Sequence, residues 1–138
     1  MLRILSGVVL IAHAVVHLLY AGQSNRTFEL QAGMTWPDGA WLFSRLLGNE
    51  PTRALASATL LLAALGFVSG AAGLIFMQAW WRPVVVGAAA LSAVAFMVFW
   101  DGALQDLPAK GAVGILISVA ILVAVLIFQW PNIAPASR

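Results

Sequence analysis

Two histidines in an apolar N-terminal stretch are the residues of this chain best placed to do chemistry. His13 and His17 are four residues apart, so in a helix they share one face and lie about 6 Å apart along the axis. Ionisable groups within hydrocarbon normally face a bundle interior, a cavity or a partner. At helical spacing the same face collects further residues: Arg3, Ser6, Leu10, Tyr20 and Ser24. This polar stripe is a candidate binding site.

Quinone binding is one chemistry that the stripe could support. Imidazole and a tyrosine hydroxyl can hydrogen-bond quinone carbonyls while apolar side chains surround the ring. The candidate cofactor-binding residues are His13, His17, Tyr20 and Arg45. A haem or chlorin held by a single histidine is also compatible, whereas two histidines on one helical turn cannot clamp a haem from both faces.

Metal binding by His13 and His17 is a further hypothesis. A stable site needs three or four protein ligands, and the sequence offers only Asp101, Asp106 or Glu50 to complete it. The alternative is a structural role, in which serine or threonine hydroxyls or a backbone carbonyl satisfy the imidazoles for about 0.6–2 kcal/mol per contact. The sequence suggests three such hydroxyls: Ser57, Thr59 and Ser69.

Other reaction chemistry finds little support in the sequence. The chain has no cysteine, which excludes disulfides, thiolate nucleophiles and Cys-ligated metals. It has no Gly-rich phosphate loop and no nucleophile-elbow serine. We therefore expect no catalytic residues and no catalytic activity of its own.

Composition determines the class of protein that must position the stripe. The chain has 138 residues, of which 62% are hydrophobic and 9% charged, and its mean hydropathy is +0.97. Ordinary globular domains are about 45–50% apolar and about 25% charged, so a soluble protein is excluded and an integral membrane protein is indicated. The net charge of +2 gives no reason to expect a nucleic-acid partner.

Four apolar stretches are each close to the ~20 residues that a helix needs to cross a bilayer. They span residues 4–22, 54–77, 83–100 and 111–130. We predict an all-α fold, an antiparallel four-helix membrane bundle forming a single transmembrane domain over 1–138. Aromatic residues support these boundaries, because Trp80, Trp81 and Trp130 fall at one interface and Tyr20 and Trp100 at the other. We expect a prokaryotic cytoplasmic membrane, with both termini in the cytoplasm.

A short interfacial helix is predicted within residues 36–48, after the first span. Pro37 suits a first helical turn, Asp38 favours the positive end of the helix dipole, and Gly48 suits a C-cap. Apolar residues between them could lie against lipid while Asp38 and Arg45 stay near water.

Small residues at four-residue spacing predict close helix packing. Gly66 and Gly70 form a G-x-x-x-G pair, with Ser69 and Gly73 in a neighbouring register. In the fourth span, Gly114 and Ser118 have the same spacing. These residues are expected to pack within the bundle or against another subunit.

The first span and the overall layout resemble the small DoxX-like membrane proteins. The resemblance rests on residues 2–7, continuing through His13 to residues 20–22, and on the four-span length. Some members of that group are associated with quinone-linked oxidoreductases, so the resemblance implies an electron-transport setting.

The leading functional hypothesis is a small non-catalytic accessory or assembly subunit of a larger membrane complex, such as a bioenergetic one. Its expected partners are the lipid bilayer and other membrane subunits or a second copy of itself. The alternative is a redox component that binds a quinone, haem, chlorin or metal through His13 and His17. A third hypothesis is an oligomeric small transporter.

Overall fold

A computed structural model describes residues 1–132 of the chain, and the described part is helical without a strand. The predicted all-α class is thereby confirmed. The elements in chain order are α1 (Leu2–Ser24), α2 (Phe43–Leu47), α3 (Asn49–Ile75), α4 (Trp81–Val98), α5 (Ala112–Leu122) and a π-helix, η1 (Val123–Ile127).

Three helices are long and apolar enough to cross a membrane. They are α1, α3 and α4, with 23, 27 and 18 residues. At 1.5 Å per residue, even the shortest extends about 27 Å, close to the ~30 Å hydrocarbon thickness. The helix of the fourth predicted span is shorter, Ala112–Ile127, and its last five residues form the π-helix. The three long helices indicate an integral membrane protein.

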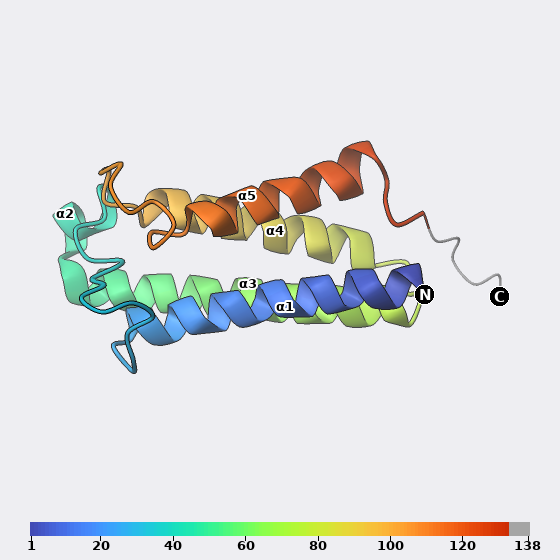
Figure 1. The fold of residues 1–138 in the computed structure, drawn as a ribbon, viewed down its shortest axis with the longest axis horizontal. Helices are drawn as coiled ribbons and strands as arrows, with labels where there is room; N and C mark the ends of the chain where they lie inside the picture. The colour runs from blue at the N-terminus through green and yellow to red at the C-terminus, as the bar shows by residue number, and fades with distance from the viewer. Residues whose placement is uncertain (133–138) are drawn as a thin grey trace.

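The four longest helices lie lengthwise beside one another, and each runs back along its predecessor (Figure 1). Helix α3 packs on both α1 and α4, and α4 also packs on α5. The loops that follow α1 and α4 gather at one end, which we call the loop end. The N-terminus and the α3–α4 link lie at the other, the terminus end.

The glycines that the sequence predicts as packing positions let α3 and α4 approach each other closely. A Cβ atom added to Gly66 would lie 2.8 Å from the Cβ atom of Ala88, and one added to Gly70 would collide with Val85. Gly73 is similarly close to the Trp80 and Trp81 side chains. The G-x-x-x-G pair is therefore used inside this chain.

Two other predicted packing residues belong to α5. Gly114 faces Phe96 of α4, and Ser118 is buried. Ser69, by contrast, is exposed, because it points away from the side of α3 on which Phe67 and Gly70 are buried. Ser69 therefore does not pack within this chain, and its contact with another subunit stays a prediction.

The segment 36–48 contains a much shorter helix than its sequence pattern suggests. Helix α2 begins only at Phe43, and Gly48, at φ 83°, ends it as predicted. Pro37 and Asp38 precede the helix instead of beginning it, because Asp38 pairs with two arginines from neighbouring segments. Trp36, just before them, is 5% exposed and packs edge-on to Tyr20. Side-chain anchoring thus shapes this segment.

Candidate functional site

The middle of the polar stripe on α1 belongs to a buried cluster that joins three helices. His13 Nε2 lies 3.1 Å from Ser118 Oγ of α5, and His17 Nε2 lies 2.6 Å from Ser92 Oγ of α4. The two serine hydroxyls are 2.7 Å apart, which closes the chain of contacts. All four side chains are at most 3% exposed. We call these four residues the His–Ser cluster.

The direction of each hydrogen bond follows from one fixed contact. His17 Nδ1 donates to the carbonyl oxygen of His13 at 2.8 Å, since a carbonyl can only accept. In a neutral imidazole, Nε2 of His17 must then accept, so Ser92 donates to it. The hydroxyl of Ser118 donates in turn to Ser92, and Nε2 of His13 donates to Ser118. Each hydroxyl donates once and accepts once, so one consistent order links α1, α4 and α5.

One nitrogen of the His–Ser cluster is left over. In this order Nδ1 of His13 carries a lone pair, and it has no hydrogen-bond partner among the described residues. The His13 ring packs edge-on to the rings of His17 and Phe67, at centroid distances of 4.6 and 4.8 Å. The Phe96 ring lies 5.7 Å from the His17 ring, centroid to centroid. Aromatic rings therefore surround the imidazoles.

The other predicted cofactor-binding residues lie apart from this cluster. The hydroxyl of Tyr20 donates toward the carbonyls of Pro108 and Ala109, at 3.0 and 3.2 Å, and thereby ties α1 to the α4–α5 loop. Arg45 lies on the short helix α2 and is exposed. The structure thus brings together His13 and His17 but does not bring Arg45 to them.

Sequence reasoning missed Ser92 as a hydrogen-bond partner of the histidines and classed Ser118 only as a packing residue. The suggested hydroxyls are engaged elsewhere or exposed. Ser57 accepts a hydrogen bond from Asn25 at 2.8 Å, Thr59 donates to the Leu55 carbonyl at 2.7 Å, and Ser69 is exposed. The sequence feature that could have indicated Ser92 and Ser118 is the four-residue spacing of small residues in the third and fourth spans. This spacing indicates which helix face points inward, but not which side chain each serine contacts.

Metal ligation has little geometric support. Among residues 1–132, no three His, Cys, Asp or Glu side chains are grouped so that they could hold a metal ion. The carboxylates that the sequence offered as extra ligands belong to the loops and the α3 start at the loop end, whereas His13 lies in the middle of α1. Two imidazoles without a third ligand make an incomplete site.

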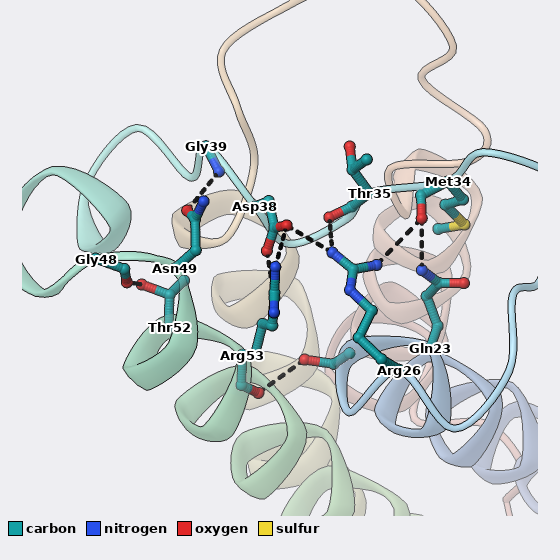
Figure 2. Close-up of polar contacts among 11 residues, drawn as sticks. Gln23, Arg26, Met34, Thr35, Asp38, Gly39, Gly48, Asn49, Thr52 and Arg53 are labelled. Atoms are coloured by element: carbon teal, nitrogen blue, oxygen red, sulfur yellow. Dashed lines mark hydrogen bonds and ion pairs between the residues drawn. The ribbon is translucent and has the colours of Figure 1, made fainter.

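A second polar assembly fixes the long loop at the loop end, and Figure 2 shows its contacts. Arg53 of α3 forms a two-pronged ion pair with Asp38, with both N–O distances at 2.6 Å. Arg26 approaches the same carboxylate at 2.7 Å and also donates to the Met34 and Thr35 carbonyls. We call Arg26, Asp38 and Arg53 the loop ion triad.

Electrostatics at this end favour charged carboxylates. Burial by itself would raise the pKa of Asp38, but hydrogen bonds and positive charge from Arg53 and Arg26 outweigh it and hold that pKa below its ordinary value. Burial would likewise raise the pKa of Asp101, but the hydrogen bond and positive charge of Lys110 help to hold it below its ordinary value. The Lys110–Asp101 ion pair measures 2.8 Å. The Asp38–Arg53 pair joins the long loop to α3, whereas the Lys110–Asp101 pair lies within the α4–α5 loop.

Comparisons of the chain with protein-family models, with curated proteins and with solved structures returned no match. The resemblance to DoxX-like proteins therefore stays a prediction from the sequence.

Proposed function

We propose that this chain is a four-span antiparallel membrane bundle that acts as a non-catalytic accessory or assembly subunit of a larger membrane complex. The observation that carries the proposal is that the buried polar side chains of the spans form hydrogen bonds within the chain itself. Three of the four imidazole nitrogens, and the Ser92 and Ser118 hydroxyls, are engaged with the chain's own atoms. A polar core of this kind sets the register of helices.

The loop end supports the same proposal. A long connection that only joins two spans does not need internal ion pairs, yet this one is held by the loop ion triad and by a buried Trp36. Gln23 adds two contacts, donating to the Met34 carbonyl and accepting from the Leu30 amide. The result is a loop of defined shape outside the spans, with ion-paired residues beside exposed apolar side chains such as Trp41, which suits contact with the extramembrane part of another subunit.

Association is tested in the native membrane. The tagged chain should migrate in a mild detergent with stoichiometric partner chains, and deletion of its gene should reduce the amount of that assembled complex. The variant Asp38→Asn, which disrupts the loop ion triad, should weaken the association, whereas Glu50→Gln should not, since Glu50 is exposed and makes no ion pair within residues 1–132. A chain that migrates alone, with no complex lost on its deletion, contradicts the proposal.

Four crossings and the orientation are tested by labelling. The chain has no native cysteine, so single cysteines report their own side of the membrane without background. Ala32→Cys and Leu104→Cys should react from one side, and Ala79→Cys and Gln129→Cys from the other. For a prokaryotic cytoplasmic membrane with cytoplasmic termini, the second pair is the cytoplasmic one. Labelling of Gln129→Cys from the side of Leu104→Cys would mean that the last helix does not cross.

A redox role is the second candidate, and the unpartnered Nδ1 of His13 favours it. A buried lone pair without a donor can accept a hydrogen bond from a quinol hydroxyl or bind the metal of a haem or chlorin. The purified protein would then carry a stoichiometric absorbing group or quinone. His13→Gln should remove that group, and Ser69→Ala should leave it in place. A signal that survives His13→Gln contradicts the redox role.

A further inference from the structure

An apolar groove lies at the terminus end, between α1 and the α5–η1 segment. Its volume is about 170 Å³. Apolar side chains from α1, α3, α4 and η1 line it, among them Leu5, Leu10, Leu74, Val85 and Val125. Ser6 also borders the groove, but its hydroxyl donates to the Leu2 carbonyl at 3.0 Å. The groove thus offers a ligand an apolar surface with no free hydroxyl.

The course of the last helix accounts for the groove. Helix α5 approaches α1 at the His–Ser cluster, where Ser118 meets His13, and rises away from α1 toward the terminus end (Figure 1). The chain then widens into the π-helix η1, after which Trp130 and Pro131 border the groove. π-Helical turns are frequent at functional sites.

A guanidinium group stands beside this groove. Arg82 lies over the ring of Trp81, with its Cζ atom 5.3 Å from the ring centroid. Its Nη2 donates to the Gln129 carbonyl at 2.8 Å and, more weakly, to the Pro131 carbonyl at 3.4 Å. Trp81 and Pro131 both line the groove, so these contacts place the positive charge at its border.

Among the residues that the structure describes, no acid pairs with Arg82 to offset its charge. The acidic residues of the chain are at the opposite, loop end: Glu29, Asp38, Glu50, Asp101 and Asp106. Within residues 1–132 no carboxylate pairs with Arg82, and its Nε and Nη1 make no hydrogen bond. Arg3 lies one turn before Ser6 on the same helix, which adds positive charge at this end.

We propose that this groove binds an acyl chain of an anionic phospholipid, with the lipid phosphate paired to Arg82. The planar guanidinium matches phosphate oxygens and keeps donors free for them. Interfacial tryptophans put Arg82 at headgroup depth, where anionic lipids attract basic residues. An apolar cavity of about 150 Å³ holds a molecule the size of benzene, so the groove accommodates a segment of one acyl chain.

Lipid retention tests the proposal directly. The full chain, purified in mild detergent, is mixed with phosphatidylglycerol and phosphatidylcholine of identical acyl chains, and bound lipid is counted by native mass spectrometry. We expect one retained phosphatidylglycerol and about tenfold preference over phosphatidylcholine. The latter carries the same phosphate, but its choline cation offsets the phosphate charge and is repelled by Arg82. Excess inorganic phosphate should not displace the lipid, because the acyl chain carries part of the binding. Equal retention of the two lipids, or displacement by phosphate alone, overturns the proposal.

Variants separate the headgroup contact from the groove. Arg82→Gln should abolish the preference for phosphatidylglycerol, while Arg45→Gln, an exposed arginine at the loop end, should preserve it. Ala124→Phe fills the groove and should remove both lipids, whereas Ala120→Phe, at an exposed position of α5, should not. Should Ala124→Phe fail to fold, the arginine pair still decides: equal effects of the two arginine variants overturn the proposal.

Discussion

Replacing Ser92 with alanine should destabilise the helix bundle measurably, because this hydroxyl is the middle link of the His–Ser cluster. It donates to His17 Nε2 at 2.6 Å and accepts from Ser118 Oγ at 2.7 Å. Alanine removes both hydrogen bonds and leaves a fully buried imidazole nitrogen without a donor. The helix backbone is unaffected, since alanine is the strongest helix former.

The magnitude follows from the two lost bonds. Polar contacts between membrane helices contribute about 0.6 kcal/mol on average and up to about 1.7 kcal/mol. Two such contacts give a loss of roughly 1–3 kcal/mol in the free energy of unfolding. The Ser92→Ala and Ser118→Ala variants share one bond, so their double variant should lose less than the sum, by about the worth of that bond.

Unfolding in mixed detergent micelles, followed by tryptophan fluorescence, measures this loss. Ser69→Ala is the matched control, because it makes the same chemical change at an exposed position of a spanning helix. We expect the control to lie within about 0.5 kcal/mol of the unmodified chain. A Ser92→Ala loss no larger than that of Ser69→Ala would refute the stabilising role of the Ser92 contacts, and strict additivity with Ser118→Ala would refute the Ser92–Ser118 hydrogen bond.

Three further predictions concern the loops and the helix contacts. Asp38→Asn should lower the free energy of unfolding by only about 1 kcal/mol, because the paired arginines are partly exposed. Since the pKa of Asp38 is lowered in the folded chain, its contribution is present above the ordinary carboxyl pKa and is lost as pH falls through the folded pKa. An acid unfolding series should therefore show a weaker pH dependence for Asp38→Asn than for the unmodified chain. Gly70→Ala should cost about 1–3 kcal/mol by forcing α3 away from Val85, whereas Gly87→Ala, where a Cβ atom meets open space, should be neutral or slightly stabilising in the same micelle assay. Gly111→Ala should cost at least about 1 kcal/mol, because φ is 90° there and the added Cβ atom would collide with the Phe96 ring; unchanged thermal unfolding of this variant would contradict that account.

Helix positions could be predicted well from the sequence because they depend on local quantities. The length of an apolar run must match the hydrocarbon thickness, and this places α1, α3 and α4 within a few residues of their observed bounds. Gly48 as a helix terminus was likewise predictable, since its positive φ is a local backbone property. The segment from Pro37 was not, because the partners of Asp38 come from two other parts of the chain.

The sequence by itself determined that this is an apolar helical chain and that His13 and His17 share one face of its first helix. Apolar content and helical periodicity suffice for both conclusions. Only the tertiary structure decided that Ser92 and Ser118 meet those histidines and that Arg82 stands beside an apolar groove. The reason is physical: a hydroxyl or a guanidinium can pair with many groups, and the choice depends on helix rotation and tilt, which are properties of the packed bundle.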